Sequence, residues 1–303
     1  MAILSEILRF VLPPTKAEMT EFLKLRQHVS RCCGIHDQYF GYITPVKSSA
    51  LPVKENEMCW VIRWFSPTFY HTPAWGIQSQ MRMRSLILFA MAPEWPHGSS
   101  SLSQDAKLTA QLKKLTSRPT TDQTTRGATS LLFRFEESQV PELKKALEAP
   151  VCEFAIINLT PNHPSRTADS PFTKSMHKTY TDCYHYPGFT GGNWSYAVNT
   201  NDTSGVALAP DDGIDGAGGA AATTDKGDHQ WKGDEEEEEE VPEPERRLAC
   251  YYLGWDTIEH HQEFSKTPLF FEEINKLAPY FGPGTGAWYV MFERHTNSLE
   301  SGP

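Results

Sequence analysis

Residues 59–64 read CWVIRW and residues 250–255 read CYYLGW, and a histidine follows each stretch within seven residues. A second pair of segments matches in the same way, because residues 6–10 read EILRF and residues 153–157 read EFAII. The offset is 147 residues for the second pair and 191 residues for the first. The difference between these offsets, 44, is nearly the length of a low-complexity stretch at residues 201–245. The pattern therefore predicts one structural unit that occurs twice, with a long insertion in the second copy.

The net charge of the chain is −10, but the negative charge is concentrated in residues 201–245. This stretch holds 15 Asp and Glu against 2 Lys, a balance of −13, so the rest of the chain carries +3. A remainder so close to neutral lacks the basic stripe that phosphate backbones require, and we expect no nucleic-acid partner. A stretch rich in Gly, Asp and Glu cannot bury enough apolar surface to offset its ordering entropy. We expect a disordered acidic insert there, which acts as a solvated spacer or as a tether for a basic partner.

The six cysteines show no CxxC pair and no ligand spacing with histidine. Cys59, Cys152 and Cys250 lie in apolar runs, where a free cysteine behaves as a small buried hydrophobe. No apolar stretch is long enough for a membrane-spanning helix, and charged residues interrupt the apolar residues 1–12. The sequence therefore predicts a cytoplasmic protein without a metal site, a membrane partner or a disulfide scaffold.

Each half of the chain shows the same order of expected elements: strand, helix, strand, strand, helix, strand. Thr15, with Glu18 three residues later, forms a capping-box pattern at the start of the first helix. Residues 143–150 join the halves as a short connector, which favours two sheets packed on each other. The expected units are residues 1–145 and residues 146–200 with 246–297; the expected strands are 6–12, 36–44, 58–65, 131–135, 151–159, 194–198, 248–255 and 287–292, and the expected helices follow Thr15 and cover 71–91, 171–184 and 257–277.

Residues 255–268, WDTIEHHQEFSKTP, place a histidine six residues after a tryptophan that ends a strand. With the βαββαβ order, this segment resembles the antibiotic-biosynthesis-monooxygenase-like (ABM) dimeric α/β-barrel family in its tandem-repeat form. Residues 64–71, WFSPTFYH, depart from the pattern by one extra residue and by having no acidic residue before the histidine. Residues 146–153, ALEAPVCE, look like the junction of tandem members. The resemblance implies an α+β fold in which two fused ferredoxin-like βαββαβ units form an intramolecular dimeric α/β-barrel, so that one chain completes the barrel as a monomer.

Proteins of this family include cofactor-independent oxygenases that act on electron-rich polycyclic phenols, and also isomerases, decarboxylases, haem-degrading enzymes and stress-related proteins. A shared fold therefore does not decide the activity. What the resemblance implies concerns the place of a ligand, which would lie between sheet and helices or inside the barrel.

His71 and His261 are the candidate catalytic residues. Each begins a helix after a strand, near the expected mouth of the barrel. A neutral imidazole there could take a phenolic proton, and a helix N-terminus disfavours the imidazolium form. The alternative is a histidine that only packs or caps. The segment from His260 to Glu263 does not have HExxH spacing, so it predicts no zinc site.

Aromatic side chains concentrate on the strands that would line or back the barrel, where they suit a flat aromatic ligand. The alternative is an ordinary sheet core. Arg63 and Arg9 lie within apolar strands, where they either neutralise an acidic substrate group or pair with Glu6, Glu57 or Glu153. The candidate substrate-binding residues are Tyr39, Tyr42, Trp60, Arg63, Trp64, Tyr251, Tyr252 and Trp255.

Two functional hypotheses follow. The first is a cofactor-independent enzyme of secondary metabolism, a monooxygenase or isomerase that acts on a phenolic, polyketide-like substrate with His71 or His261 as base. The second is a non-catalytic or stress-related α/β-barrel that binds a small molecule. The sequence contains no GxSxG, P-loop, dinucleotide or haem-attachment motif, so no cofactor is expected.

Overall fold

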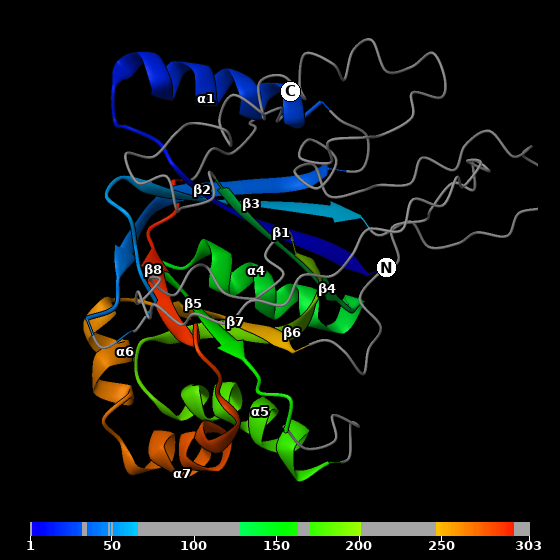
Figure 1. Cartoon of the computed structure of the whole chain (residues 1–303), viewed down its shortest axis with the longest axis vertical. Coiled ribbons are helices and arrows are strands. Elements are labelled where there is room, and N and C mark those ends of the chain that lie inside the picture. Colours follow the sequence, from blue (N-terminus) through cyan, green and yellow to red (C-terminus); the bar gives the residue numbers. More distant parts are fainter. Residues whose placement is uncertain are drawn as a thin grey trace, which may run out of the picture.

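The computed structural model describes residues 2–31, 35–47, 49, 51–65, 128–162, 170–200 and 247–293. These residues form an α+β fold built on a closed barrel of eight strands, with helices on its outside and one helix between the two sheets (Figure 1). The predicted helix at 71–91 and the predicted acidic insert at 201–245 lie outside the described residues.

The described elements follow the predicted order, except that the second helix predicted for the first half falls outside the described residues, and the boundaries of most predicted strands differ by a few residues. The first half contains β1 (Ile3–Val11), α1 (Lys16–Val29), β2 (Ile35–Pro45), β3 (Glu57–Phe65), β4 (Ala128–Phe135), a 3₁₀ turn (Glu137–Gln139) and α4 (Val140–Glu148); the second contains β5 (Val151–Asn158), α5 (Pro171–Thr181), a 3₁₀ turn (Asp182–His185), β6 (Phe189–Thr200), β7 (Leu248–Trp255), α6 (Ile258–Phe264), α7 (Pro268–Leu277), a 3₁₀ turn (Ala278–Tyr280) and β8 (Gly286–Val290).

The strands close in the order β1-β3-β2-β8-β5-β7-β6-β4, and every pair is antiparallel. The sequence order within β4-β1-β3-β2 matches that within β8-β5-β7-β6. The registers correspond as well: Cys59 pairs with Arg9, and Cys250 pairs with Ile156, the residue that matches Arg9 when the EILRF and EFAII segments are aligned. Positions in the two halves can therefore be compared one by one.

Alternation along the strands separates an interior core from two outer cores. The first outer core lies between the sheet and α1, where the Phe22 ring meets Trp60 edge-to-face at 5.3 Å. Thr15 caps α1 by accepting a hydrogen bond from the backbone N–H of Glu18 at 3.3 Å, as the capping pattern predicts. The second outer core lies between the second sheet and the helices α5, α6 and α7 (Figure 1).

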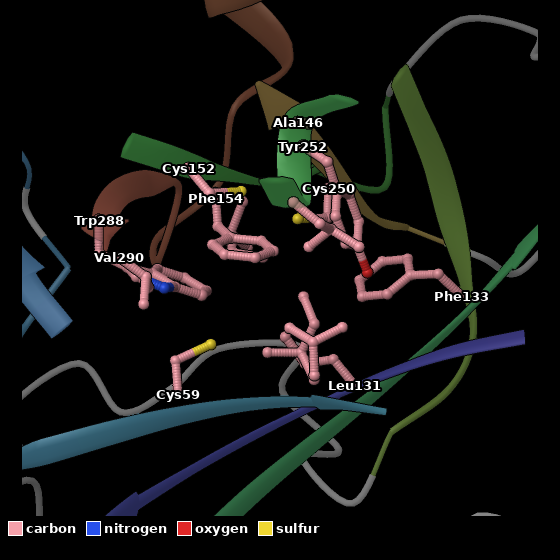
Figure 2. Packing of buried hydrophobic residues seen from close by; sticks show 14 of the residues in the cluster. Cys59, Leu131, Phe133, Ala146, Cys152, Phe154, Cys250, Tyr252, Trp288 and Val290 are labelled. Atoms are coloured by element: carbon pink, nitrogen blue, oxygen red, sulfur yellow. The ribbon is translucent and has the colours of Figure 1, made fainter. Parts of the chain in front are cut away.

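Side chains from both sheets meet in the barrel interior (Figure 2). Tyr252 on β7 lies at the centre of this aromatic packing, with ring centroids 5.0 Å from Phe154 and 5.1 Å from Phe135. Phe154 also stacks on Trp288 at 5.5 Å. Aromatic rings of this size supply much of the apolar surface that stabilises a core. The interior core also contains Ile7, Tyr39, Ile43, Leu51, Cys59, Val61, Leu131, Phe133, Cys152, Ile156, Ala197, Leu248, Cys250 and Val290.

The predicted short connector at residues 143–150 is helical for most of its length, which was not predicted from the sequence. Its Leu143, Ala146 and Leu147 share one face and are buried in the interior core. The helix lies between the two sheets (Figure 1). Gly254 on β7 permits this approach, because a Cβ atom there would meet Ala146 Cα at 2.8 Å. The segment that joins the halves is therefore also part of the barrel core.

The predicted single helix at residues 257–277 is two helices. Residues 265–267 interrupt it, and Thr267 caps α7 by accepting from the backbone N–H of Phe270 at 3.2 Å. Pro268 at the first position of α7 has no N–H to continue the helix before it. The break sets α6 apart as a short helix of seven residues. Within the part of the chain that the structure describes, no helix is long and apolar enough to cross a membrane.

Candidate functional site

A buried glutamate on β5 is the starting point of the candidate site. Glu153 points to the outer face of the second sheet and is only 3% exposed. Its direct neighbours in the register are Leu253 on β7 and Tyr289 on β8. Trp255, two residues after Leu253, donates a hydrogen bond from Nε1 to Glu153 Oε2 at 3.0 Å. The carboxyl group is thus held from one side by the end of β7.

His261 on α6 completes the arrangement. Thr257 caps this helix by accepting from the backbone N–H of His260, and the helix then turns His261 back towards the sheet. Its Nε2 lies 3.1 Å from Glu153 Oε1, and its Nδ1 lies 2.5 Å from the Tyr289 hydroxyl oxygen. The predicted base is therefore the central member of a Glu153–His261–Tyr289 triad, with the Trp255 ring centroid 5.3 Å from the imidazole.

The hydrogen bonds assign a role to each atom of the triad. An ionised Glu153 is an acceptor only, so it takes the Trp255 indole proton on one oxygen and the His261 Nε2 proton on the other. His261 Nδ1 is then free to accept the proton of the Tyr289 hydroxyl. This tautomer satisfies every polar atom in the chain from tryptophan to tyrosine.

Burial raises the pKa of both acidic members of the triad, Glu153 and Tyr289. Burial raises the pKa of Glu153, although the neighbouring His261 and the Trp255 hydrogen bond act against that rise. Burial also raises the pKa of Tyr289 well above its usual value, and the negative charges of Glu153 and Glu259 add to the effect. Tyr289 is therefore a neutral phenol at pH 7 unless His261 accepts its proton.

Among the described residues, the first half differs from this arrangement at the position of the phenol. Glu6 corresponds to Glu153 and is fully buried, but Ser130 donates a hydrogen bond to it at 2.8 Å. Leu132 stands opposite Glu6, where the second half has Tyr289 opposite its glutamate. The other predicted catalytic residue, His71, lies outside the described residues. Of the two halves, the second has the phenol.

The eight predicted substrate-binding residues are distributed over both faces of the barrel, so they do not line one site. Tyr39, Arg63 and Tyr252 face the interior. Trp60, Trp64 and Tyr42 belong to the first outer core, and Tyr251 and Trp255 belong to the second. Only Trp255 contacts the triad.

The two strand arginines find different acidic partners. Arg9 pairs with Glu57 at 3.0 Å, one of the partners expected from the sequence. Arg63 instead binds Asp37 on β2, with 2.6 Å between Nε and Oδ1, so the glutamates considered for it were the wrong partners. A residue on the neighbouring strand reaches the guanidinium more directly because Asp37 and Arg63 are register neighbours.

Sequence reasoning did not assign Glu153 or Tyr289 to the site. The available signal was a glutamate within the apolar run VCEFAII, since a charge in a strand buried on both faces needs a partner. Tyr289 carried no such signal, because tyrosine is common in strands. Among the described residues, no group of three or more His, Cys, Asp and Glu side chains could hold a metal ion.

No protein-family model and no curated protein matches the chain. Among solved structures, the chain is similar to an anthrone oxidase-like protein, with 8% identity, 96% of this chain and 92% of that chain covered, and a TM-score of 0.45. It is also similar to a protein named "Putative monooxygenase" from Fusobacterium nucleatum, with 6% identity, 98% and 95% covered, and a TM-score of 0.44. A chlorite dismutase from Candidatus Nitrospira defluvii has 8% identity, 95% and 90% covered, and a TM-score of 0.38. Likeness at such low identity does not identify the side chains that act.

Proposed function

We propose that the protein is a cofactor-independent enzyme, of the monooxygenase or isomerase type, that removes a proton from an aromatic, phenolic small molecule of the polyketide-like class in secondary metabolism. The observation that carries the proposal is the Glu153–His261–Tyr289 triad. A carboxylate, an imidazole and a phenol are joined there by two hydrogen bonds, at 3.1 Å and 2.5 Å. Such a chain orients the base and stabilises the imidazolium that forms when the base accepts a proton.

The proton path follows from the roles of the atoms. His261, at 9% exposed, is the triad member nearest to solvent, so we expect the substrate to approach from the side of α6. Tyr289 is only 1% exposed, so α6 must move aside before the substrate hydroxyl can reach the Tyr289 oxygen. The hydroxyl then gives its proton to that oxygen while the Tyr289 proton moves to His261 Nδ1. The imidazolium is then paired with Glu153, and the substrate is left as an electron-rich phenolate. This phenolate reacts with dioxygen in a monooxygenase or is reprotonated elsewhere in an isomerase.

We also propose that the two halves are ferredoxin-like units fused by duplication. The support comes from the matching strand order and from the constant offset in sequence that relates each residue of β1 to its counterpart in β5. In this proposal the second unit carries the site, since Leu132 replaces the phenol in the first.

The second candidate function is a small-molecule-binding barrel without catalysis. The observation that favours it is that the triad is fully satisfied from within, because each polar atom of Glu153 and His261 already has a protein partner. In this role the triad would lock α6 onto the sheet.

Oxygen consumption and product formation with a panel of anthrones and related phenols distinguish the two functions. We expect His261→Gln to lower turnover by about 10² to 10⁴-fold, the usual contribution of a general base. His260→Gln is the matched control, since His260 is the neighbouring histidine on the same helix and lies outside the triad. His71→Ala is measured in parallel. Unchanged turnover in His261→Gln would exclude the base, and binding without turnover in the wild type would favour the second function.

A further inference from the structure

The seam between β2 and β8 (Figure 1) continues past the last residue of β8. Inside the seam Ile43 lies opposite Val290, and the two strands are antiparallel. Three residues further along the chain from Val290, the backbone N–H of Glu293 donates to the carbonyl oxygen of Phe40 at 2.9 Å. The register is the same at both places, so the chain at Glu293 still runs antiparallel to β2, in the direction of Ile35.

Beyond this bridge, one side of β2 has no strand partner among the described residues. The strand β3 pairs with β2 as far as Ile35, but β8 pairs only with Ile43–Pro45. Alternate residues of a strand turn their N–H and C=O groups to the same side, so Gln38 turns its main-chain groups to the side that Phe40 uses. We call residues 35–39 of β2, on this side, the free margin.

The side chains next to the free margin fit a chain that stays close to β2. Gly41 permits the approach, since a Cβ atom there would meet the Met291 carbonyl oxygen at 2.5 Å. Phe292 then turns to the barrel interior, where its ring centroid lies 5.7 Å from that of Tyr39. The residues that follow are thereby directed along the free margin.

The chain behaves differently after β4, and the difference favours an extended chain after β8. Arg134 corresponds to Met291 in the register of the two halves, and its carbonyl oxygen accepts a hydrogen bond from the Ser195 hydroxyl of β6 at 2.7 Å. The chain then turns into the 3₁₀ turn and α4, which has a buried apolar face. Residues 294–298, RHTNS, contain no apolar side chain, so they lack the stripe that would hold a second such helix against the sheet.

Acidic side chains gather beside Tyr39, on the interior side of the free margin. The Tyr39 hydroxyl donates to Asp37 Oδ2 at 3.3 Å. Burial raises the pKa of Tyr39, and the negative charges of Asp37 and Glu148 add to the rise. Arg63 neutralises Asp37, whereas Glu148 at the end of α4 pairs at 3.7 Å with Lys144, whose side chain is exposed. A second cation near Tyr39 would therefore meet a carboxylate that it can bind.

We propose that residues 294–297 form an added strand on the free margin of β2, and that Arg294 pairs there with Glu148. In the register of the seam, Arg294 lies opposite Tyr39 and on the same side of the sheet, where the acidic side chains gather. The segment thereby ties the free margin to α4. This docking is independent of the triad and of its proposed activity, since it uses neither the residues nor the face of the triad.

Main-chain hydrogen bonds alternate along such a strand, and the alternation distinguishes neighbouring residues of the segment. Because the N–H of Glu293 faces β2, the N–H groups of residues 295 and 297 face β2 as well. His295 therefore donates to the Gln38 carbonyl oxygen and accepts from the Gln38 N–H. Thr296 turns its own N–H away from β2.

Amide hydrogen exchange of the full chain, followed by NMR, tests the added strand at Gln38. His295→Pro removes the N–H that donates to Gln38, and it should speed exchange of the Gln38 amide by at least about tenfold. Thr296→Pro is the matched control, because a proline is tolerated in an edge strand where its missing N–H would face away from the sheet, and we expect a change below about threefold. The amide of Tyr39, which faces β3, is the internal reference in each variant.

Arg294→Gln and Glu148→Gln test the ion pair. Each should speed exchange of the Gln38 amide about two- to threefold, and the double variant should exchange no faster than either single variant, because both changes remove the same interaction. Lys144→Gln is the control, since it removes the exposed partner of Glu148 and should leave exchange at Gln38 unchanged.

Three results would overturn the docking. They are exchange of the wild-type Gln38 amide at the rate of an exposed amide, equal effects of His295→Pro and Thr296→Pro, and additive effects of Arg294→Gln and Glu148→Gln. Protection of Gln38 that rises with protein concentration would also overturn it, because the free margin would then bind a strand of a second copy.

Discussion

Leu132 and Tyr289 occupy corresponding positions in the two halves of the barrel, since each lies directly opposite the buried glutamate of its own half. The aliphatic side chain of Leu132 offers Glu6 no hydrogen bond, and Ser130 is one donor to Glu6, whereas the phenol extends the hydrogen-bonded chain of Glu153 through His261. The two outer faces therefore have different chemistry despite their matching register.

Removing the Tyr289 hydroxyl is expected to destabilise the second half. Tyr289→Phe leaves the buried His261 Nδ1 without its partner, which costs about 1–3 kcal/mol in the free energy of unfolding. Urea denaturation measures this loss. Tyr280→Phe is the control, because it removes a hydroxyl from a half-buried ring that keeps its contact with Phe172. If both variants lose the same free energy of unfolding, the hydrogen bond to His261 contributes no more to stability than an ordinary tyrosine hydroxyl does.

The buried thiols of the interior core are expected to lower the free energy of unfolding at alkaline pH. Burial raises the pKa of Cys59 to about 12 and raises the pKa values of Cys152 and Cys250 well above their usual value. Because these pKa values are higher in the folded state, the folded chain holds protons that the unfolded chain releases above about pH 8.5. The buried thiols therefore make their full contribution to the free energy of unfolding below that pH, and this contribution declines as pH rises towards the folded pKa values. Each thiol should lower the free energy of unfolding by about 1.4 kcal/mol per pH unit in this range.

Cys250→Ala isolates one of these thiols. Its plot of unfolding free energy against pH should be less steep than that of the wild type by about 1.4 kcal/mol per unit above pH 9. Parallel curves for the two proteins would mean that Cys250 does not titrate differently on unfolding.

Because α4 packs closely on β7, we expect position 254 to tolerate only glycine. In Gly254→Ala the new Cβ would lie 2.2 Å from Thr190 Oγ1 and 2.8 Å from the Cα of Ala146, so the threonine side chain and the helix must both shift, at a cost of about 1–3 kcal/mol. Thermal unfolding monitored by circular dichroism measures this cost. Gly282→Ala is the comparison, because its nearest atom is 3.3 Å away, and we expect a change below about 1 kcal/mol. Equal effects would argue against close packing of α4.

The Arg9–Glu57 ion pair is expected to be sensitive to removal of one partner. Both side chains are buried, at 2% and 7% exposed, and Arg9 also lies 4.4 Å above the Trp288 ring. Glu57→Ala leaves the guanidinium without its counter-ion and should cost about 3–5 kcal/mol in the free energy of unfolding. Glu21→Ala breaks an exposed pair with Lys24 and should cost less than about 1 kcal/mol. A small loss in Glu57→Ala would show that water reaches Arg9.

The strands were predictable because alternation and apolar runs report burial directly. Pairs such as Cys59 and Cys250 indicated matching halves before any register was known, and the structure places them at corresponding positions. Helix α4 was not predicted because residues 140–148 are short and begin near a proline, so their apolar face gives a weak signal. The break before Pro268 was missed because the apolar spacing continues through it.

The site was only partly predictable for a different reason. His261 was found from its distance to Trp255 along the chain, which is a local feature. Its partners Glu153 and Tyr289 come from strands that are far apart in sequence, and only the register β7-β5-β8 brings them together. The same holds for Arg63 and Asp37, which meet across a strand pair.

Closure of the barrel also decides how this chain can meet other molecules. Each of the eight described strands has a neighbour on both sides, but the two seams between the halves are short. They pair Ile43–Pro45 with residues 288–290 and residues 131–133 with residues 197–200. An extended peptide, or a strand of a second copy, therefore finds free main-chain groups only beside these seams, along the remaining parts of β2 and β6, and not along a whole strand.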